Sequence, residues 1–325
     1  MLTSFNVWAV QRCSPLRSTA ATVLWASLLA FGLGACGGSE PTPAGSGNPP
    51  AGDLPPLRLG AIPDQDPDQV QRLYERLTTY LETELAIDVE YQPVTDYAAA
   101  VTAFKVGDLD LVWFGGLTGV QARLQVPGAQ AIVQRDIDPE FTSVFIANTS
   151  TGLTPLASVA DLTRLAGLSF TFGSESSTSG RLMPQYFLQQ AGVDLEDFKG
   201  EVGFSGNHDA TIKLVEAGSY EVGVLNSQVW EARQGEGAID LTKVQVILET
   251  PPYYDYHWVI RPEVETRYGE GFNQKIQDAF VGLDISVAEE AEVLELFGAE
   301  KFIPTQNENY AQIEAIGRQI GKIQD

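Results

Sequence analysis

Short apolar runs that resemble β-strands alternate with helical segments along most of this chain, and this alternation limits the possible folds most strongly. The runs at 57–62 (LRLGAI) and 109–114 (LDLVWF) are typical of buried strands. Between them, apolar residues recur at helical spacing behind Asp66-Pro67, a pair that is typical of a helix start. Strands that alternate with helices pack as layers around mainly parallel sheets, so the sequence predicts an α/β fold.

The alternation occurs in two series, which predicts two lobes. The second series begins near Gly152, and longer strand-like runs at 141–148 and 253–261 flank it and are candidate crossovers. We therefore expect a first lobe made of 57–148 plus 253–325, and an inserted second lobe made of 149–252. The end of the chain is predicted to be helical over three segments, 263–283, 287–297 and 309–323.

The N-terminal segment has the pattern of an export signal. Arg12 and Arg17 precede a short apolar run, which ends in Leu33-Gly34-Ala35-Cys36. We predict a lipoprotein-type signal peptide at 1–35 and an acylated Cys36; an ordinary signal peptide with an incidental cysteine is the alternative. A Gly/Pro/Ser-rich linker at 36–56 follows. The protein is then exported to the periplasm or cell surface, and lipid at Cys36 is its sole membrane anchor.

Composition excludes several classes of partner and site. With 43 acidic and 20 basic residues, the formal net charge is -23, which argues against binding to nucleic acid. Any anion must therefore be held by local amides and hydroxyls. Cys13 and Cys36 are the only cysteines and His208 and His257 the only histidines, so we expect neither a metal site nor a cofactor.

The sharpest local feature is the segment 173–180, GSESSTSG, which lies between a predicted strand and a predicted helix. The first amides of a helix and its dipole form an anion-binding site. Four consecutive hydroxyl residues add donors there, Ser176, Ser177, Thr178 and Ser179. Simple capping of the helix is the alternative, but one serine would suffice for that.

Further candidate ligand residues follow other predicted strands. In open α/β sheets, ligands bind at the carboxyl ends of the strands. The residues found there are Asp64, Tyr97, Phe114, Gly115, His208 and Asn226. A single histidine, or an aromatic residue in a helix, is more often structural, so His208 and Tyr97 carry that alternative.

The sequence lacks the common enzyme signatures, including G-x-S-x-G, the P-loop and H-E-x-x-H. Asp255 and His257 could in principle join a serine in a triad, but their spacing alone gives this little weight.

Several motifs in the same order resemble the phosphate/phosphonate/phosphite-type periplasmic binding proteins of ABC importers. The motifs are AIPD (61–64), VTDYAAAV (94–101), DLVWFGG (110–116), FGSESSTSGRLMP (172–184), SGNHDA (205–210) and EVGVLNS (221–227). The resemblance covers 57–323. PPYYDYHW (251–258) and FIPTQNENY (302–310) are similar to a branch associated with selenate import.

The resemblance implies a periplasmic binding protein fold whose two lobes close on an anion held by Ser177, Thr178 and Ser179, together with Tyr97 and His208. The chain departs from phosphonate binders in having Phe114-Gly115 where Tyr-Gly is common. It also has Asn226 where an Asp is common, which favours an oxyanion that carries no proton.

We therefore expect a non-catalytic, monomeric binding lipoprotein. Its partners would be a small tetrahedral oxyanion (phosphonate, phosphite, phosphate, selenate or sulfate) and the permease and ATPase of an importer. The alternatives are an enzyme on the same fold, such as a biosynthetic transferase, or the ectodomain of an oxyanion sensor.

Overall fold

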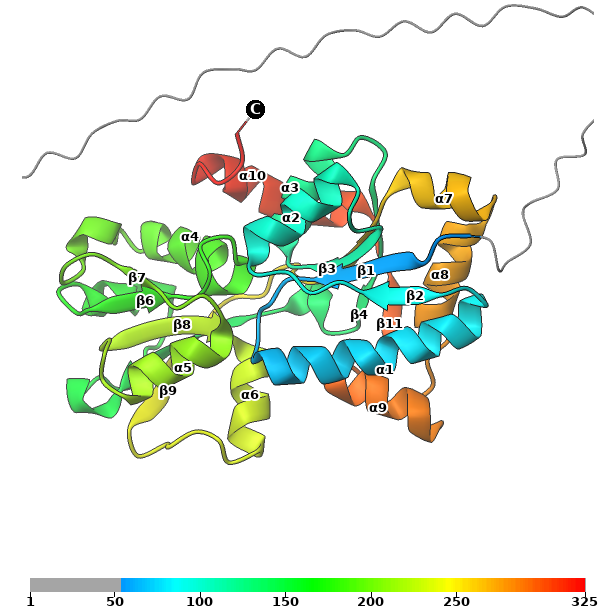
Figure 1. Cartoon of the computed structure of the whole chain (residues 1–325). Coiled ribbons are helices and arrows are strands. Elements are labelled where there is room, and N and C mark those ends of the chain that lie inside the picture. Colours follow the sequence, from blue (N-terminus) through cyan, green and yellow to red (C-terminus); the bar gives the residue numbers. More distant parts are fainter. Residues whose placement is uncertain (1–53, 325) are drawn as a thin grey trace, which may run out of the picture. The chain divides into compact units, whose positions relative to one another are not determined.

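The first lobe is built on a six-stranded sheet whose strands come from both ends of the described chain (Figure 1). The structure is a computed structural model that describes residues 54–324, so the predicted signal peptide, Cys36 and most of the linker lie outside the described residues. In spatial order the strands are β11 (Phe302–Pro304), β4 (Gln130–Arg135), β10 (His257–Ile260), β3 (Leu111–Phe114), β1 (Leu57–Ala61) and β2 (Val89–Tyr91). β1 is parallel to β2 and β3, whereas β10 runs antiparallel to both β3 and β4, and β11 is antiparallel to β4.

The second lobe is built on a five-stranded sheet. In spatial order its strands are β7 (Gly203–Phe204), β6 (Phe170–Phe172), β8 (Val222–Asn226), β5 (Ser143–Asn148) and β9 (Val244–Glu249). β6 is parallel to β7 and β8, and β5 is antiparallel to β8 and β9.

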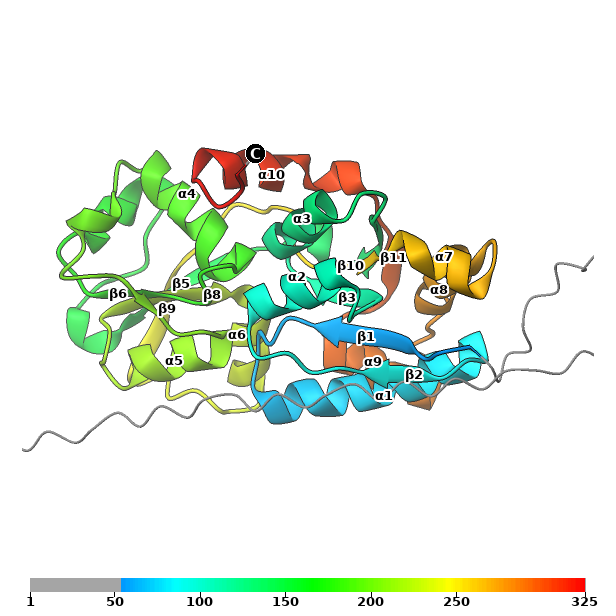
Figure 2. The same cartoon turned by 45° about the horizontal axis from the view of Figure 1, so that its top comes forward.

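Helices cover both faces of each sheet (Figures 1 and 2). In the first lobe they are α1 (Pro67–Leu85), α2 (Tyr97–Val106), α3 (Gly116–Gln125), α7 (Pro262–Tyr268), α8 (Phe272–Val281), α9 (Ala288–Phe297) and α10 (Ala311–Gln319). In the second lobe they are α4 (Met183–Gln190), α5 (His208–Glu216) and α6 (Ser227–Gly235). α1 begins as predicted, because Asp66 accepts a hydrogen bond from the Asp68 amide and Pro67 occupies the first turn.

Two strands that carry the chain between the lobes explain why the sheets are mixed rather than mainly parallel. β5 enters the second sheet from the first lobe, and β10 returns from the second lobe, so each runs against the strands beside it. The chain has already entered the second sheet at Ser143, whereas the sequence analysis kept residues up to 148 in the first lobe. Phe141 and Tyr253 pair where the two crossings meet.

The α/β class and the two-lobe fold are confirmed, but the predicted elements were incomplete. Helix α3 and strands β4 and β11 were not predicted. The predicted helix at 263–283 is broken into α7 and α8, since Gly269 and Gly271 adopt positive φ angles that end one helix and begin the next. The predicted strand at 253–261 is regular only from His257, which leaves Asp255 in an irregular segment between the lobes.

Candidate functional site

The predicted anion loop is buried and folds back on itself. The Ser177 hydroxyl accepts a 2.8 Å hydrogen bond from the Gly180 amide, and the Gly173 amide donates to the Gly180 carbonyl at 2.9 Å. A Cβ at Gly173 would lie 3.3 Å from the Gly180 Cα, so both positions favour glycine. The helix predicted to follow this loop begins as a π-helical turn over Thr178–Leu182, and Ser177 caps it. A π-turn of this kind is often found at functional sites.

The four hydroxyl residues of the loop differ in their surroundings. Ser177, Thr178 and Ser179 are each 1–2% exposed, whereas Ser176 is only partly buried. Ser177 is used for capping, and Thr178 accepts a 2.9 Å hydrogen bond from the Leu117 amide of the first lobe. Ser179 Oγ is buried without a hydrogen-bond partner. The loop therefore does more than cap its helix, since one hydroxyl contacts the opposite lobe and another is unpaired.

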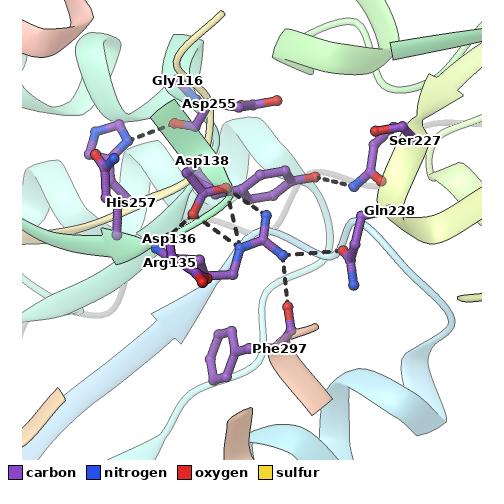
Figure 3. A network of polar contacts seen from close by, with 12 residues as sticks. Gly116, Arg135, Asp136, Asp138, Ser227, Gln228, Asp255, His257 and Phe297 are labelled. Atoms are coloured by element: carbon purple, nitrogen blue, oxygen red, sulfur yellow. Dashed lines mark hydrogen bonds and ion pairs between the residues drawn. The ribbon is translucent and has the colours of Figure 1, made fainter. Parts of the chain in front are cut away.

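The start of α3 brings the first lobe against this loop. The Gly116 amide donates to Asp255 Oδ1 at 2.9 Å, and the two residues lie together in Figure 3. A Cβ at Gly115 would lie 3.1 Å from Thr178 Oγ1 and 3.2 Å from Asp255 Oδ1, so glycine permits this close approach. Phe114 is fully buried and packs edge-on against Phe104, which makes it part of the core beneath the site.

Three buried polar atoms without a hydrogen bond define the candidate site. They are Tyr97 Oη from α2, Ser179 Oγ from the anion loop, and Asp255 Oδ2 from the crossing segment. Burial raises the pKa values of Tyr97 and Asp255. The nearby Ser177 hydroxyl opposes this rise at Tyr97, and the Thr178 and Ser179 hydroxyls oppose it at Asp255. Within residues 54–324, no lysine or arginine side chain donates a hydrogen bond to any of the three. For binding an anion, the site therefore provides neutral hydrogen-bond donors and one carboxyl group.

Two buried carboxyl groups have raised pKa values. Burial raises the pKa of Asp255 to about 7, although the Gly116 amide and the loop hydroxyls oppose this. Burial likewise raises the pKa of Asp64 to about 6, against a hydrogen bond from Tyr256 and the charge of Arg135. The sequence analysis included Asp64 but considered Asp255 only as a triad member. The feature that could have identified Asp255 as a site residue is its position in an irregular segment between the two lobes.

His208 and Asn226 lie beside the loop but are engaged within the protein. The His208 ring nitrogens lie 3.4 Å from the Asn226 amide and 3.3 Å from the Tyr256 hydroxyl. Burial lowers the pKa of His208 to about 4, so its ring is neutral near pH 7. A Cβ at Gly180 would lie 3.2 Å from His208 Cε1, which places the ring against the anion loop. The Asn226 side chain accepts from the Val229 amide at 2.6 Å and donates to Tyr256 at 3.1 Å.

Among residues 54–324, no group of three or more His, Cys, Asp or Glu side chains could hold a metal ion. In the same range, no helix combines the length and apolar character needed to cross a membrane.

Two α/β lobes joined by two crossings, with polar groups of both lobes converging at the carboxyl ends of their strands, define the class of periplasmic solute-binding proteins. A family model described as "ABC transporter, phosphonate, periplasmic substrate-binding protein" matches residues 59–310. The chain belongs to this family of ABC-transporter substrate-binding proteins.

Individual relatives agree with this assignment. The chain is 47% identical over 268 residues to the "Probable ABC transporter phosphite binding protein PhnD1" of Prochlorococcus marinus, with 82% of this chain and 90% of the relative covered. A solved structure of PhnD1 from that organism, in complex with methylphosphonate, matches with a TM-score of 0.81 over 82% of this chain and 98% of its own. The "Phosphonates-binding periplasmic protein" of Escherichia coli is 25% identical over 251 residues, which are 76% of this chain and 71% of the relative.

Proposed function

We propose that this chain captures a small phosphorus oxyanion, of the phosphite or methylphosphonate type, and delivers it to the permease and ATPase of an importer without altering it. The observation that carries this proposal is the convergence of three buried polar atoms without hydrogen-bond partners, Tyr97 Oη, Ser179 Oγ and Asp255 Oδ2. Similarity to a phosphite binding protein and to a methylphosphonate complex supports the choice of ligand.

The chemistry of the site favours an oxyanion that shares a proton. Hydroxyls and amides can donate to most oxygens of a tetrahedral anion, while Asp255 requires a proton between itself and the ligand. Phosphorus oxyanions can share such a proton even at pH 8, where they are mostly dianions, because their oxygens are basic enough to have a second pKa of about 6. Sulfate and selenate carry no proton near pH 7, and an ionised Asp255 facing them would cost several kcal/mol.

Asn226 by itself led to a different expectation. The missing carboxylate at that position predicted an oxyanion without a proton. In the structure Asn226 caps α6 and donates to Tyr256, while Asp255 supplies a carboxyl group close to the loop hydroxyls. We therefore assign the acceptor role to Asp255 and place phosphite, phosphate and methylphosphonate ahead of selenate.

Calorimetry with phosphite, methylphosphonate, phosphate, selenate and sulfate at pH 6 and pH 8 tests the proposal. We expect phosphorus oxyanions to bind at least about tenfold more tightly than selenate at pH 8. Selenate and sulfate should gain affinity at pH 6, where Asp255 is protonated and the repulsion is removed. Preference for selenate at pH 8 would refute the role given to Asp255, and no binding of any of the five would refute the proposed function.

We also propose how the protein is presented to the importer. The run that ends in Leu33-Gly34-Ala35-Cys36 and the Gly/Pro/Ser-rich linker behind it support anchoring of the protein by lipid on Cys36.

A further inference from the structure

Two arginines near the cleft are each clamped by a carboxylate of their own lobe. In the first lobe, Arg135 pairs with Asp138 at 2.6 Å, and in the second lobe Arg233 pairs with Asp209 at 2.6 Å. The arginine side chains are only 4% and 7% exposed, and Arg135 also lies over the Tyr256 ring. Both guanidinium groups are therefore fixed in position before they contact the opposite lobe.

Each arginine reaches across the cleft to a glutamine of the other lobe. Arg135 Nη1 donates to Gln228 Oε1 at 3.2 Å, a contact drawn in Figure 3. Arg233 Nη2 donates to Gln65 Oε1 at 3.1 Å. Within residues 54–324, neither glutamine side chain makes any other hydrogen bond. The two contacts are thus reciprocal, and each glutamine side chain serves only the join between the lobes.

Backbone contacts place both pairs in one closely packed region. The His208 amide donates to the Asp64 carbonyl at 3.0 Å, and the Asp66 amide donates to Asp209 at 2.8 Å. A Cβ at Gly298 would lie 2.0 Å from Gln228 Nε2, so this glutamine reaches the first-lobe backbone at the end of α9.

A groove connects the two pairs on this side of the molecule. Gln65, Gln228 and Arg233 line a groove of ≈ 710 Å³ between α1, α6 and α9. Neither glutamine forms a hydrogen bond with the anion-loop hydroxyls or with Asp255, as far as residues 54–324 are concerned.

We propose that Gln65 and Gln228 form a latch that sets how long a ligand is held, without contacting the ligand. The inference rests on the proposed function, because ligand release is its main readout. Both hydrogen bonds exist only while the lobes are together, so they stabilise the closed form whichever anion is bound. Loss of the latch lowers the closed population and weakens every ligand by the same factor.

The choice of glutamine suits a latch that must open. A neutral amide oxygen accepts a charge-assisted hydrogen bond from each arginine. When the lobes separate, the charges of Arg135 and Arg233 stay paired with Asp138 and Asp209, so opening leaves no buried charge without a partner. A glutamate in the same place would add an ion pair to be broken at each opening.

The test compares the double variant Gln65→Ala/Gln228→Ala with wild type, using phosphite and methylphosphonate and stopped-flow tryptophan fluorescence. We expect ligand release to accelerate about tenfold or more, because hydrogen bonds to charged groups are lost. Association should change much less than release, because most effects of variants at one binding site appear in the dissociation rate. The factor should be the same for both anions, and the circular dichroism spectrum of the ligand-free protein should not change.

Gln245→Ala is the matched control, because that glutamine donates to the Leu153 carbonyl within the second lobe. Release at the wild-type rate from the double variant would overturn the latch. So would a loss confined to one anion, which would mean that the glutamines contact the ligand. A lower unfolding temperature with unchanged release would assign them a packing role instead.

Failure of the proposed function is distinguishable from failure of the latch. If wild type binds neither anion, the proposed function is wrong, and small-angle scattering of the ligand-free proteins then decides the latch alone. The double variant should have a larger radius of gyration than wild type and Gln245→Ala. Equal radii for the three proteins would overturn it.

Discussion

Replacing Asp255 with asparagine should make the ligand-free protein more stable at alkaline pH. The side chain is 1% exposed, and burial raises its pKa from 3.8 to about 7. Each unit of pKa shift corresponds to about 1.4 kcal/mol, so the charged form costs the folded state about 4 kcal/mol. Asparagine keeps the size and one acceptor oxygen for the Gly116 amide but carries no charge.

The sign follows from proton binding in the two states. Below pH 4 Asp255 is protonated whether the chain is folded or unfolded, so it has no effect on stability. Between pH 4 and pH 7 the folded state keeps a proton that the unfolded state has lost, so stability falls as pH rises. Above pH 7 the whole penalty is present. The free energy of unfolding of Asp255→Asn should therefore rise relative to that of wild type by about 4 kcal/mol from pH 4 to pH 8.

Urea unfolding of wild type and Asp255→Asn, without ligand, at pH 4.5, 6, 7 and 8 measures this advantage. Asp64, whose pKa burial raises to about 6, lowers the stability of both proteins in the same direction and cancels in the difference. Asp240→Asn is the control, since a hydrogen bond from the Thr242 hydroxyl lowers the pKa of Asp240 and its replacement should give no gain with rising pH. A difference between Asp255→Asn and wild type that is the same at pH 4.5 and pH 8 would refute the argument.

Three further predictions concern the anion loop and the anchor. Thr178→Ala and Ser179→Ala should each weaken phosphite binding about tenfold or more in calorimetry, with a wild-type circular dichroism spectrum; unchanged affinity in both would remove the loop from the site. Gly115→Ala should also weaken binding, because the new Cβ would lie 3.1 Å from Thr178 Oγ1, whereas Gly235→Ala, which meets nothing within 4 Å, should bind as wild type does; equal affinities would contradict this reading. Mass spectrometry of membrane-extracted protein should find an acylated Cys36 at the N-terminus, and a soluble mature form that starts elsewhere would exclude the anchor.

Local pattern was enough for the parts of the site that one segment can specify. The loop at 173–180 was predicted because a strand, a run of hydroxyl residues and a helix start follow one another within a few residues. Asp64, Tyr97 and His208 were found in the same way, since each follows a recognisable strand. The structure places Tyr97, Ser177, Thr178 and Ser179 together and gives Phe114 and Asn226 structural roles.

The α/β class, the two series of elements and the anion loop can be predicted from the amino-acid sequence, because they depend on periodicity and on neighbours along the chain. Which distant residues meet depends on how the chain folds in three dimensions. Asp255 contacts Gly116 across 139 residues, and Arg233 contacts Gln65 across 168. Neither pair has a local pattern, since the first forms only when the crossing segment packs against the start of α3, and the second only when the two lobes come together. Burial then sets the pKa of Asp255, and burial is a property of the folded chain that no single segment can reveal.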